Sequence, residues 1–273
     1  MDLHRRAFIA LAGALAAAPA FAQATPQVAP EIWADLARDV FKGRALENGA
    51  GLVLLDAPYR AEDAAIVPVT FGTTLPADDS RTASRLWLIV DENPAPVAGT
   101  FEIGPKSGLT QIATRIRVNQ YSNLHVVAEL SDGKLYAVEK YVKAAGGCSA
   151  PAAKRLDEAE ATMGQMRFRE FAGAGNASSR QGDALFMMRH PNNSGLQMDQ
   201  VTHLYTPARF VQDLKIFQGD DLVLAMDGGI SISEDPNFRF NFTRNGAVAM
   251  SARAVDTDGK VFEGRWPLGR TAS

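Results

Sequence analysis

The spacing of apolar residues near the start of the chain is helical. Within Pro30–Phe41, apolar residues lie at Ile32, Leu36 and Val40, and Gly43 follows shortly after the last of them. Residues at this spacing form one stripe along a helix, and proline and glycine are typical of a helix's beginning and end. We therefore predict one short helix over residues 30–41, with its apolar stripe packed against the rest of the domain.

Beyond this helix the pattern changes to short runs of β-branched and aromatic residues separated by Pro, Gly, Asn and Asp. Polar and apolar residues alternate within Thr114–Val118, as in a strand buried on one face. Ser131–Lys134 contains an Asp-Gly pair and favours a tight hairpin. The predicted strands are Leu52–Leu55, Ile66–Phe71, Leu86–Val90, Ala98–Ile103, Gln111–Val118, Leu124–Leu130 and Leu135–Val142. Seven short strands within residues 30–142 indicate an immunoglobulin-like β-sandwich.

The same pattern returns in residues 164–273 and predicts a second sandwich of similar size. Its predicted strands are Gln165–Phe171, Ala184–Met188, Val201–Tyr205, Val211–Phe217, Leu222–Met226, Phe238–Phe242, Ala247–Val255 and Val261–Trp266. Ala128–Tyr136 and Ala254–Phe262 align around a shared Asp-Gly-Lys turn, so we expect both sandwiches to close with equivalent hairpins. The fold class that follows is all-β, with two immunoglobulin-like β-sandwich domains in one chain.

A short segment of small residues, 143–151, separates the two predicted sandwiches. It reads Lys-Ala-Ala-Gly-Gly-Cys-Ser-Ala-Pro, and no large apolar residue lies between Lys143 and Arg155. Residues 152–163 are rich in helix formers and carry charges of both signs, which predicts a solvated linker helix. We expect residues 143–151 to form an exposed, mobile arm.

The first 22 residues have the pattern of an export signal. Arg5 and Arg6 give a positive start, residues 7–18 are apolar and alanine-rich, and Ala20-Phe21-Ala22 matches an A-x-A cleavage site. We expect residues 1–22 to be a signal peptide of the twin-arginine or Sec type and the mature chain to be periplasmic. No other apolar run reaches the ~20 residues that a membrane span needs. A net charge of -3 without a clustered basic face argues against a nucleic-acid partner.

Cys148 is the one cysteine of the chain, and it lies in this arm. Structural cysteines of exported proteins come in pairs, so a lone one is buried and inert, paired between molecules, or reactive. Its neighbours offer no local core to bury it, and Gly146 and Gly147 widen the backbone's conformational range. These features favour a reactive thiol, and a disulfide-linked dimer through Cys148 remains an alternative.

Other chemistries find less support in the sequence. The histidines of the mature chain, His125, His190 and His203, show no metal-ligand spacing to one another or to Cys148. A copper site would draw on Met187, Met188, His190, Met198 and His203, but methionines in a strand usually pack in a core. We expect no cofactor and no metal. A Cys–His nucleophile pair stays open, since such pairing is spatial.

The order of several motifs resembles a fusion of SoxY and SoxZ, the two parts of a periplasmic carrier in bacterial sulfur oxidation. The SoxY-like motifs are Val67-Pro68-Val69, Asn93-Pro94, Ala113–Arg117, Val127–Gly133 and Gly146-Gly147-Cys148. The SoxZ-like motifs are Arg189-His190-Pro191, Gly195 and Asn237–Phe240. The chain most resembles the fused carriers that are associated with quinoprotein dehydrogenases.

The resemblance implies two immunoglobulin-like sandwiches side by side and a carrier rather than an enzyme. It implies that Cys148 binds intermediates of sulfur-compound oxidation, such as that of thiosulfate, covalently, and that Gly146 and Gly147 form the hinge. Arg189, His190 and Pro191 would be structural, near the domain junction. The implied partners are periplasmic sulfur-oxidation enzymes or a quinoprotein dehydrogenase; the alternative is an assembly module for that dehydrogenase without covalent cargo.

In the family the arm ends in Gly-Gly-Cys-Gly-Gly at a free C-terminus. Here Ser149-Ala150-Pro151 follow the cysteine and the chain continues. The resulting expected organisation is a signal peptide at 1–22, a SoxY-like sandwich at 30–142, the arm at 143–151, the linker helix at 152–163 and a SoxZ-like sandwich at 164–273.

Overall fold

The computed structural model describes residues 30–76, 78–152, 156–171, 180–199 and 202–268. The expected signal peptide, residues 1–22, lies outside these ranges. Within them, no helix is long and apolar enough to cross a membrane. The described chain is dominated by strands, which confirms the predicted all-β class.

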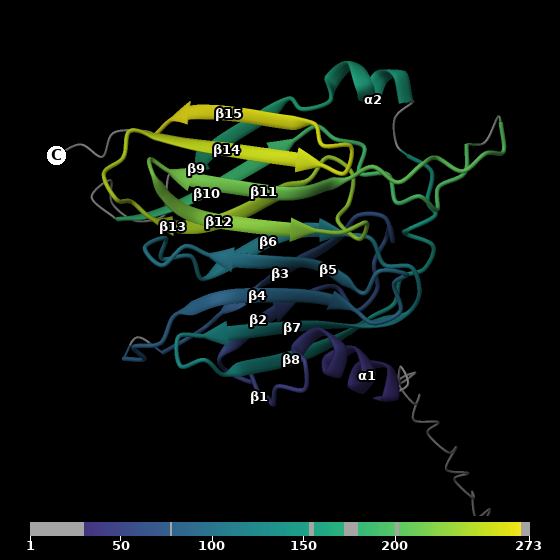
Figure 1. Ribbon diagram of the computed structural model, residues 1–273. Coiled ribbons are helices and arrows are strands. Elements are labelled where there is room, and N and C mark those ends of the chain that lie inside the picture. The colour runs from purple at the N-terminus through teal and green to yellow at the C-terminus, as the bar shows by residue number, and fades with distance from the viewer. Residues whose placement is uncertain (1–29, 77, 153–155, 172–179, 200–201, 269–273) are drawn as a thin grey trace, which may run out of the picture.

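Helix α1 (Pro30–Phe41) has the predicted bounds. Its apolar stripe packs on the outer face of one sheet, where Phe41 joins Ile89, Val127 and Leu135 in a small second core. The indole of Trp33 stacks flat on the imidazole of His125, with 3.6 Å between ring centroids. The stripe therefore serves packing within the domain (Figure 1).

Strands β1 to β8 make up the first half. They are β1 (Leu46–Asn48), β2 (Val53–Asp56), β3 (Val67–Thr73), β4 (Ala83–Val90), β5 (Val97–Ile103), β6 (Gln111–Ile116), β7 (Ser122–Leu130) and β8 (Leu135–Val142). The seven predicted strands are present, and β1, a three-residue strand, is additional.

The second half begins with helix α2 (Leu156–Thr162), within the predicted linker helix. Its strands are β9 (Met166–Phe171), β10 (Gln181–Met188), β11 (Val211–Gln218), β12 (Asp221–Gly228), β13 (Asn237–Thr243), β14 (Ala249–Asp256) and β15 (Val261–Pro267). The strand predicted over 201–205 is wrong: residues 202–205 form a loop with one isolated bridge, between Tyr205 and Met198. Leu204 and Tyr205 are 69% and 63% exposed, so these apolar residues have no core to face.

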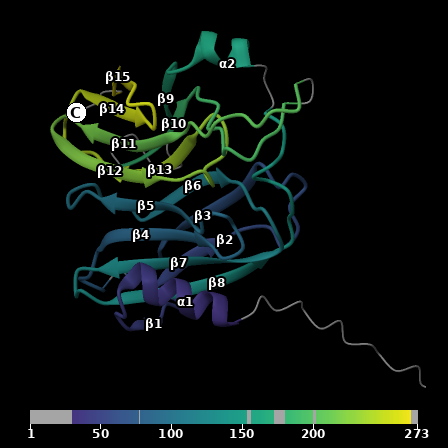
Figure 2. The ribbon, with the colours of Figure 1, turned by 45° about the vertical axis from the view of Figure 1, so that its right-hand side comes forward.

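The two halves share their sheets. One sheet has nine strands in the order β1-β8-β7-β4-β5-β12-β11-β14-β15, and the other has six in the order β2-β3-β6-β13-β10-β9. Antiparallel pairing of β5 with β12 and of β6 with β13 joins the halves edge to edge. Figures 1 and 2 show both sheets running through the whole molecule from α1 to β15.

The order of strands is mirrored about this junction. In the larger sheet, β8-β7-β4-β5 of the first half is followed by the reverse sequence of equivalents, β12-β11-β14-β15. In the smaller sheet, β2-β3-β6 likewise faces β13-β10-β9. The halves are therefore topological repeats, which extends the likeness first seen in the Asp-Gly-Lys turns.

The two closing hairpins have the same turn. Leu130 N donates to Lys134 O, and Asp256 N donates to Lys260 O, each at 3.1 Å. Gly133 and Gly259 occupy the same place in these turns, with φ of 76° and 78°. The expectation of equivalent hairpins is confirmed.

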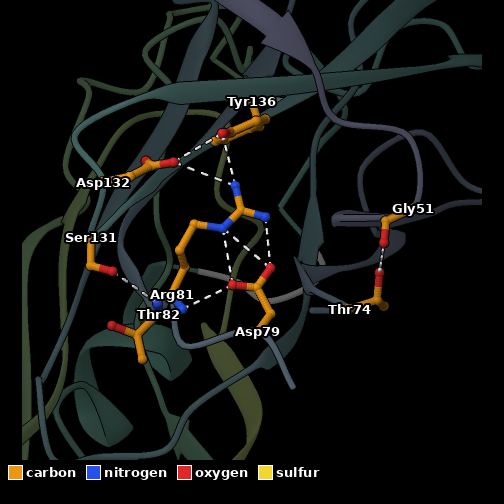
Figure 3. Close-up of polar contacts among 8 residues, drawn as sticks. All are labelled: Gly51, Thr74, Asp79, Arg81, Thr82, Ser131, Asp132 and Tyr136. Atoms are coloured by element: carbon orange, nitrogen blue, oxygen red, sulfur yellow. Dashed lines mark hydrogen bonds and ion pairs between the residues drawn. The ribbon is translucent and has the colours of Figure 1, made fainter. Parts of the chain in front are cut away.

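The tip of the β7–β8 hairpin is tied to the segment before β4 by Arg81. Its guanidinium binds the carboxylate of Asp79 at 2.6 Å and the hydroxyl of Tyr136 at 2.8 Å, and Tyr136 in turn donates to Asp132 at 2.9 Å (Figure 3). Arg81 holds the pKa of Asp79 down to about 2. The cluster fixes the far end of the hairpin whose second strand, β8, leads to Cys148.

One continuous core lies between the sheets and crosses the junction. The ring of Phe101 on β5 meets that of Phe238 on β13 edge-on, with centroids 6.2 Å apart. Strand pairing and apolar burial both favour the joined form, so the chain is a double sandwich with a shared interior.

Candidate functional site

The candidate site is the segment of residues 143–151 that follows β8, here called the thiol loop. At its start Lys143 N donates to Tyr59 O at 2.7 Å, and Ala61 N donates to Lys143 O at 3.2 Å. The ammonium of Lys143 lies 4.9 Å from the centre of the Tyr59 ring. The loop therefore begins along the segment between β2 and β3 rather than in solvent.

Gly146 and Gly147 occupy a tight turn against the first half. Gly146 N donates to Asn119 O at 2.8 Å, and Gly147 N donates to Val118 O at 3.0 Å. Gly146 has φ of 82°, and a Cβ on Gly147 would lie 2.0 Å from Ala64 O. Only glycine fits the second position, and the first favours it, because no side chain can occupy that contact and L-residues resist positive φ.

The second half clamps the other side of the thiol loop. Ser194 Oγ donates to the carbonyl oxygen of Cys148 at 2.5 Å, and Gln197 Nε2 donates to that of Ala150 at 3.1 Å. Both residues are buried and belong to the long loop between β10 and β11. That loop and the segment between β8 and α2 lie at the same end of the molecule (Figure 2).

Cys148 is buried, with a relative exposure of 0%. The expectation of an exposed, mobile thiol is wrong for this conformation. The sequence around the cysteine offers no apolar cover. In the fold, however, the neighbouring Gly147 packs against Ala64 and Val118, and the carbonyl of Cys148 accepts from Ser194, which is distant in sequence. Burial of a small, neutral side chain needs only that such surfaces meet around it.

Burial raises the pKa of the Cys148 thiol from 9.0 to about 11, and the nearby Arg117 guanidinium opposes this rise. A thiol with this pKa is protonated at neutral pH and is a poor nucleophile. The two lysines before the cysteine have other partners: Lys140 binds Asp56 at 2.7 Å, and Lys143 faces Tyr59. While the loop is docked, the thiol is therefore protonated and unreactive.

Arg117 lies at the junction of the halves and is 2% exposed. Its Nη1 donates to the carbonyl oxygens of Ile232 and Ile230, at 2.5 and 3.3 Å. Its Nε is buried without a hydrogen-bond partner, and burial lowers the pKa of the guanidinium. A buried arginine with an unsatisfied donor is costly, and it points to a role beyond packing.

Asn93 joins the same junction. Its side-chain nitrogen donates to Arg117 O and to Ser231 Oγ, each at 2.8 Å, and its oxygen accepts from Asn119 N at 2.7 Å. Sequence reasoning quoted Asn93 and Arg117 only as parts of motifs and did not single out Ser194 or Gln197. Asn93 lies in the polar turn Asp91–Pro94, and Arg117 alternates with Ile116 as a residue of an exposed strand face would, so the sequence carried no signal that either one is buried.

The predicted structural residues of the second half lie near the junction. His190 is buried; its Nδ1 accepts from Asn192 N at 3.0 Å, and its Nε2 faces Asp256 at 3.5 Å. Asp235 accepts from Arg189 Nη1 and from His190 N. Pro191 is also buried. The bonds of Arg189 and His190 thus tie the backbone that follows β10 to Asp235 and Asn192.

The residues considered for a copper site do not form one. Met188 packs in the core while its neighbour Met187 faces outward from β10, and His190 is bonded to Asp256. In the described ranges no group of three or more His, Cys, Asp or Glu side chains is placed to hold a metal ion.

Comparison with known proteins divides the chain at the thiol loop. The family model of the sulfur oxidation protein SoxY matches residues 37–148, and that of the sulphur oxidation protein SoxZ matches residues 174–267. The first match ends at Cys148 itself. No curated protein matches the chain.

Solved structures resemble parts of the chain. The sulfur carrier protein SoxY from Chlorobium limicola f thiosulfatophilum is 26% identical over 42% of this chain and 97% of its own, with a TM-score of 0.35. A superoxide reductase (neelaredoxin) from Ignicoccus hospitalis is 13% identical over 40% of this chain and 90% of its own, with a TM-score of 0.30.

Proposed function

Because the chain joins a SoxY domain and a SoxZ domain in one polypeptide, we propose that it is a periplasmic carrier that binds sulfur-compound intermediates covalently at Cys148 and presents them to partner enzymes. SoxY and SoxZ make up a carrier protein family, which supports a carrier rather than an enzyme. The leader expected at residues 1–22 supports the periplasmic location.

The observation that carries the proposal is the place of the thiol. Cys148 is the one cysteine of the chain, it stands at the end of the SoxY match, and it follows two glycines that shape a tight turn. A lone thiol at such a position suits attachment of a cargo better than structural cross-linking.

Loading requires that the thiol loop open, because the docked thiol is buried and protonated. Opening breaks the bonds from Gly146 and Gly147 to the first half and those from Ser194 and Gln197 to the second. Gly146 and Gly147 serve as the hinge. Since the loop is anchored at both ends, by β8 and by the chain leading to α2, its reach is smaller than that of a free tail.

The covalent step forms an S–S bond between Cys148 Sγ and the sulfur of a reduced, anionic sulfur compound. The thiol releases its proton to water, and a two-electron-accepting partner enzyme takes up the electron pair. The thiolate of the open loop is the reacting form of the cysteine. Because the thiolate and the reduced sulfur anion are both nucleophiles, their S–S bond forms only as the partner enzyme withdraws the two electrons.

Mass spectrometry of the protein purified from its own periplasm, without reductant, tests this proposal. We expect sulfur-containing adducts on the Cys148 peptide that reductant removes. A Cys148 that is unmodified under every growth condition, including growth on reduced sulfur compounds, contradicts it.

The burial of Cys148 favours a second candidate, an assembly module for a periplasmic quinoprotein dehydrogenase with no covalent cargo. Complementation of a deletion strain separates the two. A Cys148→Ser variant that restores growth fully supports the module and rules out the carrier, whereas failure of a stably folded variant supports the carrier. A non-reducing gel detects the third case, a disulfide-linked dimer.

A further inference from the structure

A cavity of about 750 Å³ lies on the outer face of the six-stranded sheet, at the junction of the two halves. On β10, Ala184, Phe186 and Met188 are buried in the core, so Leu185 and Met187 face the other way. Met187 is paired with Asn237 on β13 and with Arg167 on β9, and all three line the cavity. The thiol loop closes one side through Ala150 and Pro151, while Cys148 is not among the lining residues.

The cavity is rich in arginine. Arg115, Arg117, Arg167 and Arg189 line it, against the carboxylates of Asp63, Glu234 and Asp235. Asp235 is already engaged by Arg189 and by His190 N, and Asp63 accepts from Ala65 N at 2.7 Å. With four arginines against three carboxylates, the lining has an excess of one positive charge, which favours an anion.

Arg117 gives the cavity a built-in donor. It is buried, lines the cavity, and its Nε lacks a hydrogen-bond partner. Guanidinium groups bind carboxylate, sulfonate and phosphate oxygens through paired N–H donors, and an unsatisfied buried donor is relieved by such a ligand. This orphaned donor points to a bound oxyanion.

Part of the remaining lining is apolar, and Gln165, Gln197 and Asn237 also line the cavity. The apolar lining residues include Leu185, Met187, Ile66 and Pro151. An inorganic ion would gain nothing from contact with them. The volume also lies in the range of roughly 300–1,000 Å³ that is typical of sites for organic ligands. Charge and shape together suit a molecule with an anionic head and a short apolar body.

We propose that this cavity is a non-covalent binding site for a small organic oxyanion, whose head contacts Arg117 and Arg167 and whose body lies on Leu185 and Met187. The site goes beyond the covalent carrier function, because it needs no thiol. Its closed side is the thiol loop, so a bound ligand contacts Ala150 and Pro151 and stabilises the docked loop.

Calorimetric titration of the full mature chain with Cys148→Ser tests the site without covalent chemistry. The probes are hexanesulfonate and hexanoate at constant ionic strength, with hexanol and inorganic sulfate as matched probes that lack the charge or the chain. We expect saturable binding of a hexyl anion and at least tenfold weaker binding of hexanol and of sulfate. A preference between sulfonate and carboxylate identifies the head group.

Arg167→Gln and Arg169→Gln form the matched pair of variants. Both residues are exposed and lie on β9, but only Arg167 lines the cavity; Arg169 packs over the ring of Phe171. We expect Arg167→Gln to weaken binding about tenfold, as for a lost charge-assisted hydrogen bond, and Arg169→Gln to change it less than twofold.

Arg117→Lys tests the role of the buried donor in ligand binding, and the melting temperature of the variant shows whether it folds. If it does not fold, the comparison of the Arg167 and Arg169 variants tests the proposal alone. The proposal is overturned if no hexyl anion binds saturably, or if the Arg167 and Arg169 variants weaken binding equally. It is likewise overturned if sulfate binds as tightly as hexanesulfonate.

Discussion

The hydroxyl of Ser194 donates a hydrogen bond to the backbone carbonyl of Cys148, across 46 positions of sequence and from one half of the chain to the other. This bond makes the exposure of the thiol depend on the packing of the second half. Together with the bond from Gln197 to Ala150, it converts an apparently free glycine-rich segment into a docked loop.

Replacing Ser194 by alanine should raise the reactivity of Cys148. The variant loses the bond to Cys148 O and the one that Ser194 Oγ accepts from Leu196 N, each worth about 1 kcal/mol. Loss of about 1 kcal/mol of docking free energy makes the open state of the loop about fivefold more populated, and loss of both bonds makes it more so. Alkylation of Cys148 by iodoacetamide should accelerate by at least this factor. Rates at neutral pH under native conditions measure this.

Ser149→Ala is the control, because among the described residues the Ser149 hydroxyl bonds only within the turn, to Gly146 O at 3.3 Å. We expect its alkylation rate to stay within twofold of the wild type. Equal acceleration in both variants would show that the clamp from the second half does not govern access to the thiol.

Replacing Gly147 by alanine should undock the thiol loop. The new Cβ would lie 2.0 Å from Ala64 O and 2.7 Å from Val118 O, and backbone atoms on both sides cannot move away cheaply. We expect alkylation of Cys148 to rise at least tenfold while far-UV circular dichroism stays unchanged. An alkylation rate like the wild type's would contradict the docked geometry.

Gly146→Ala should act more mildly. Gly146 has φ of 82° but open space around it, so alanine there costs only the strain of a left-handed conformation, about 1–2 kcal/mol. Gly259→Ala is its match, since Gly259 has φ of 78° and equal space in a distant hairpin. Both variants should melt at similar temperatures, but only Gly146→Ala should speed alkylation.

The local elements of this fold follow from the sequence. The helix over residues 30–41 and the Asp-Gly-Lys hairpins were predicted at their places, because apolar periodicity and turn residues act within a few positions. The pairing of β5 with β12 was not predicted, because edge-to-edge joining depends on strands far apart in the chain. The predicted strand over 201–205 failed because its apolar residues meet no partner surface.

In the candidate site, too, the local features could be predicted from the sequence and the tertiary contacts could not. Cys148, Gly146 and Gly147 stood out through composition, and their contacts give the two glycines a geometric reason. The burial of the thiol did not follow from its neighbours, because Ser194 and Val118 reach it only through the tertiary fold. The attachment role of Cys148 stays a prediction.

The Arg81 cluster should shape the stability of the protein in acid. Hydrogen bonds from Arg81 lower the pKa of Asp79 to about 2, from an ordinary 3.8 (Figure 3). A carboxyl whose pKa is depressed by folding stabilises the protein above its unfolded value, and this contribution is lost as the pH falls through the folded pKa. Between pH 4 and 2, Arg81→Gln should therefore lose less stability than the wild type.

Urea unfolding at several pH values between 2 and 6 measures this slope. Arg253→Gln is the control, because Arg253 forms a longer, exposed pair with Glu263, at 3.5 Å, far from the cluster. Its stability should decline in acid in parallel with the wild type. A parallel decline of the Arg81 variant would show that Asp79 titrates normally.

The docked thiol should make the protein less stable at alkaline pH. Burial raises the pKa of Cys148 from 9.0 to about 11, so folding favours the neutral thiol. A raised pKa stabilises the fold below the unfolded value, and this contribution is lost as the pH rises through the folded one. Two pKa units correspond to at most ~3 kcal/mol of unfolding free energy, lost between about pH 9 and 11.

The measurement is the difference in unfolding free energy between the wild type and Cys148→Ser at pH 8, 9, 10 and 11. Tyrosines and lysines titrate in both proteins, so the difference isolates the thiol. We expect this difference to shrink steadily from pH 9 to pH 11. A constant difference would mean that the thiol already meets water in the folded protein, and that opening of the loop is not what controls loading.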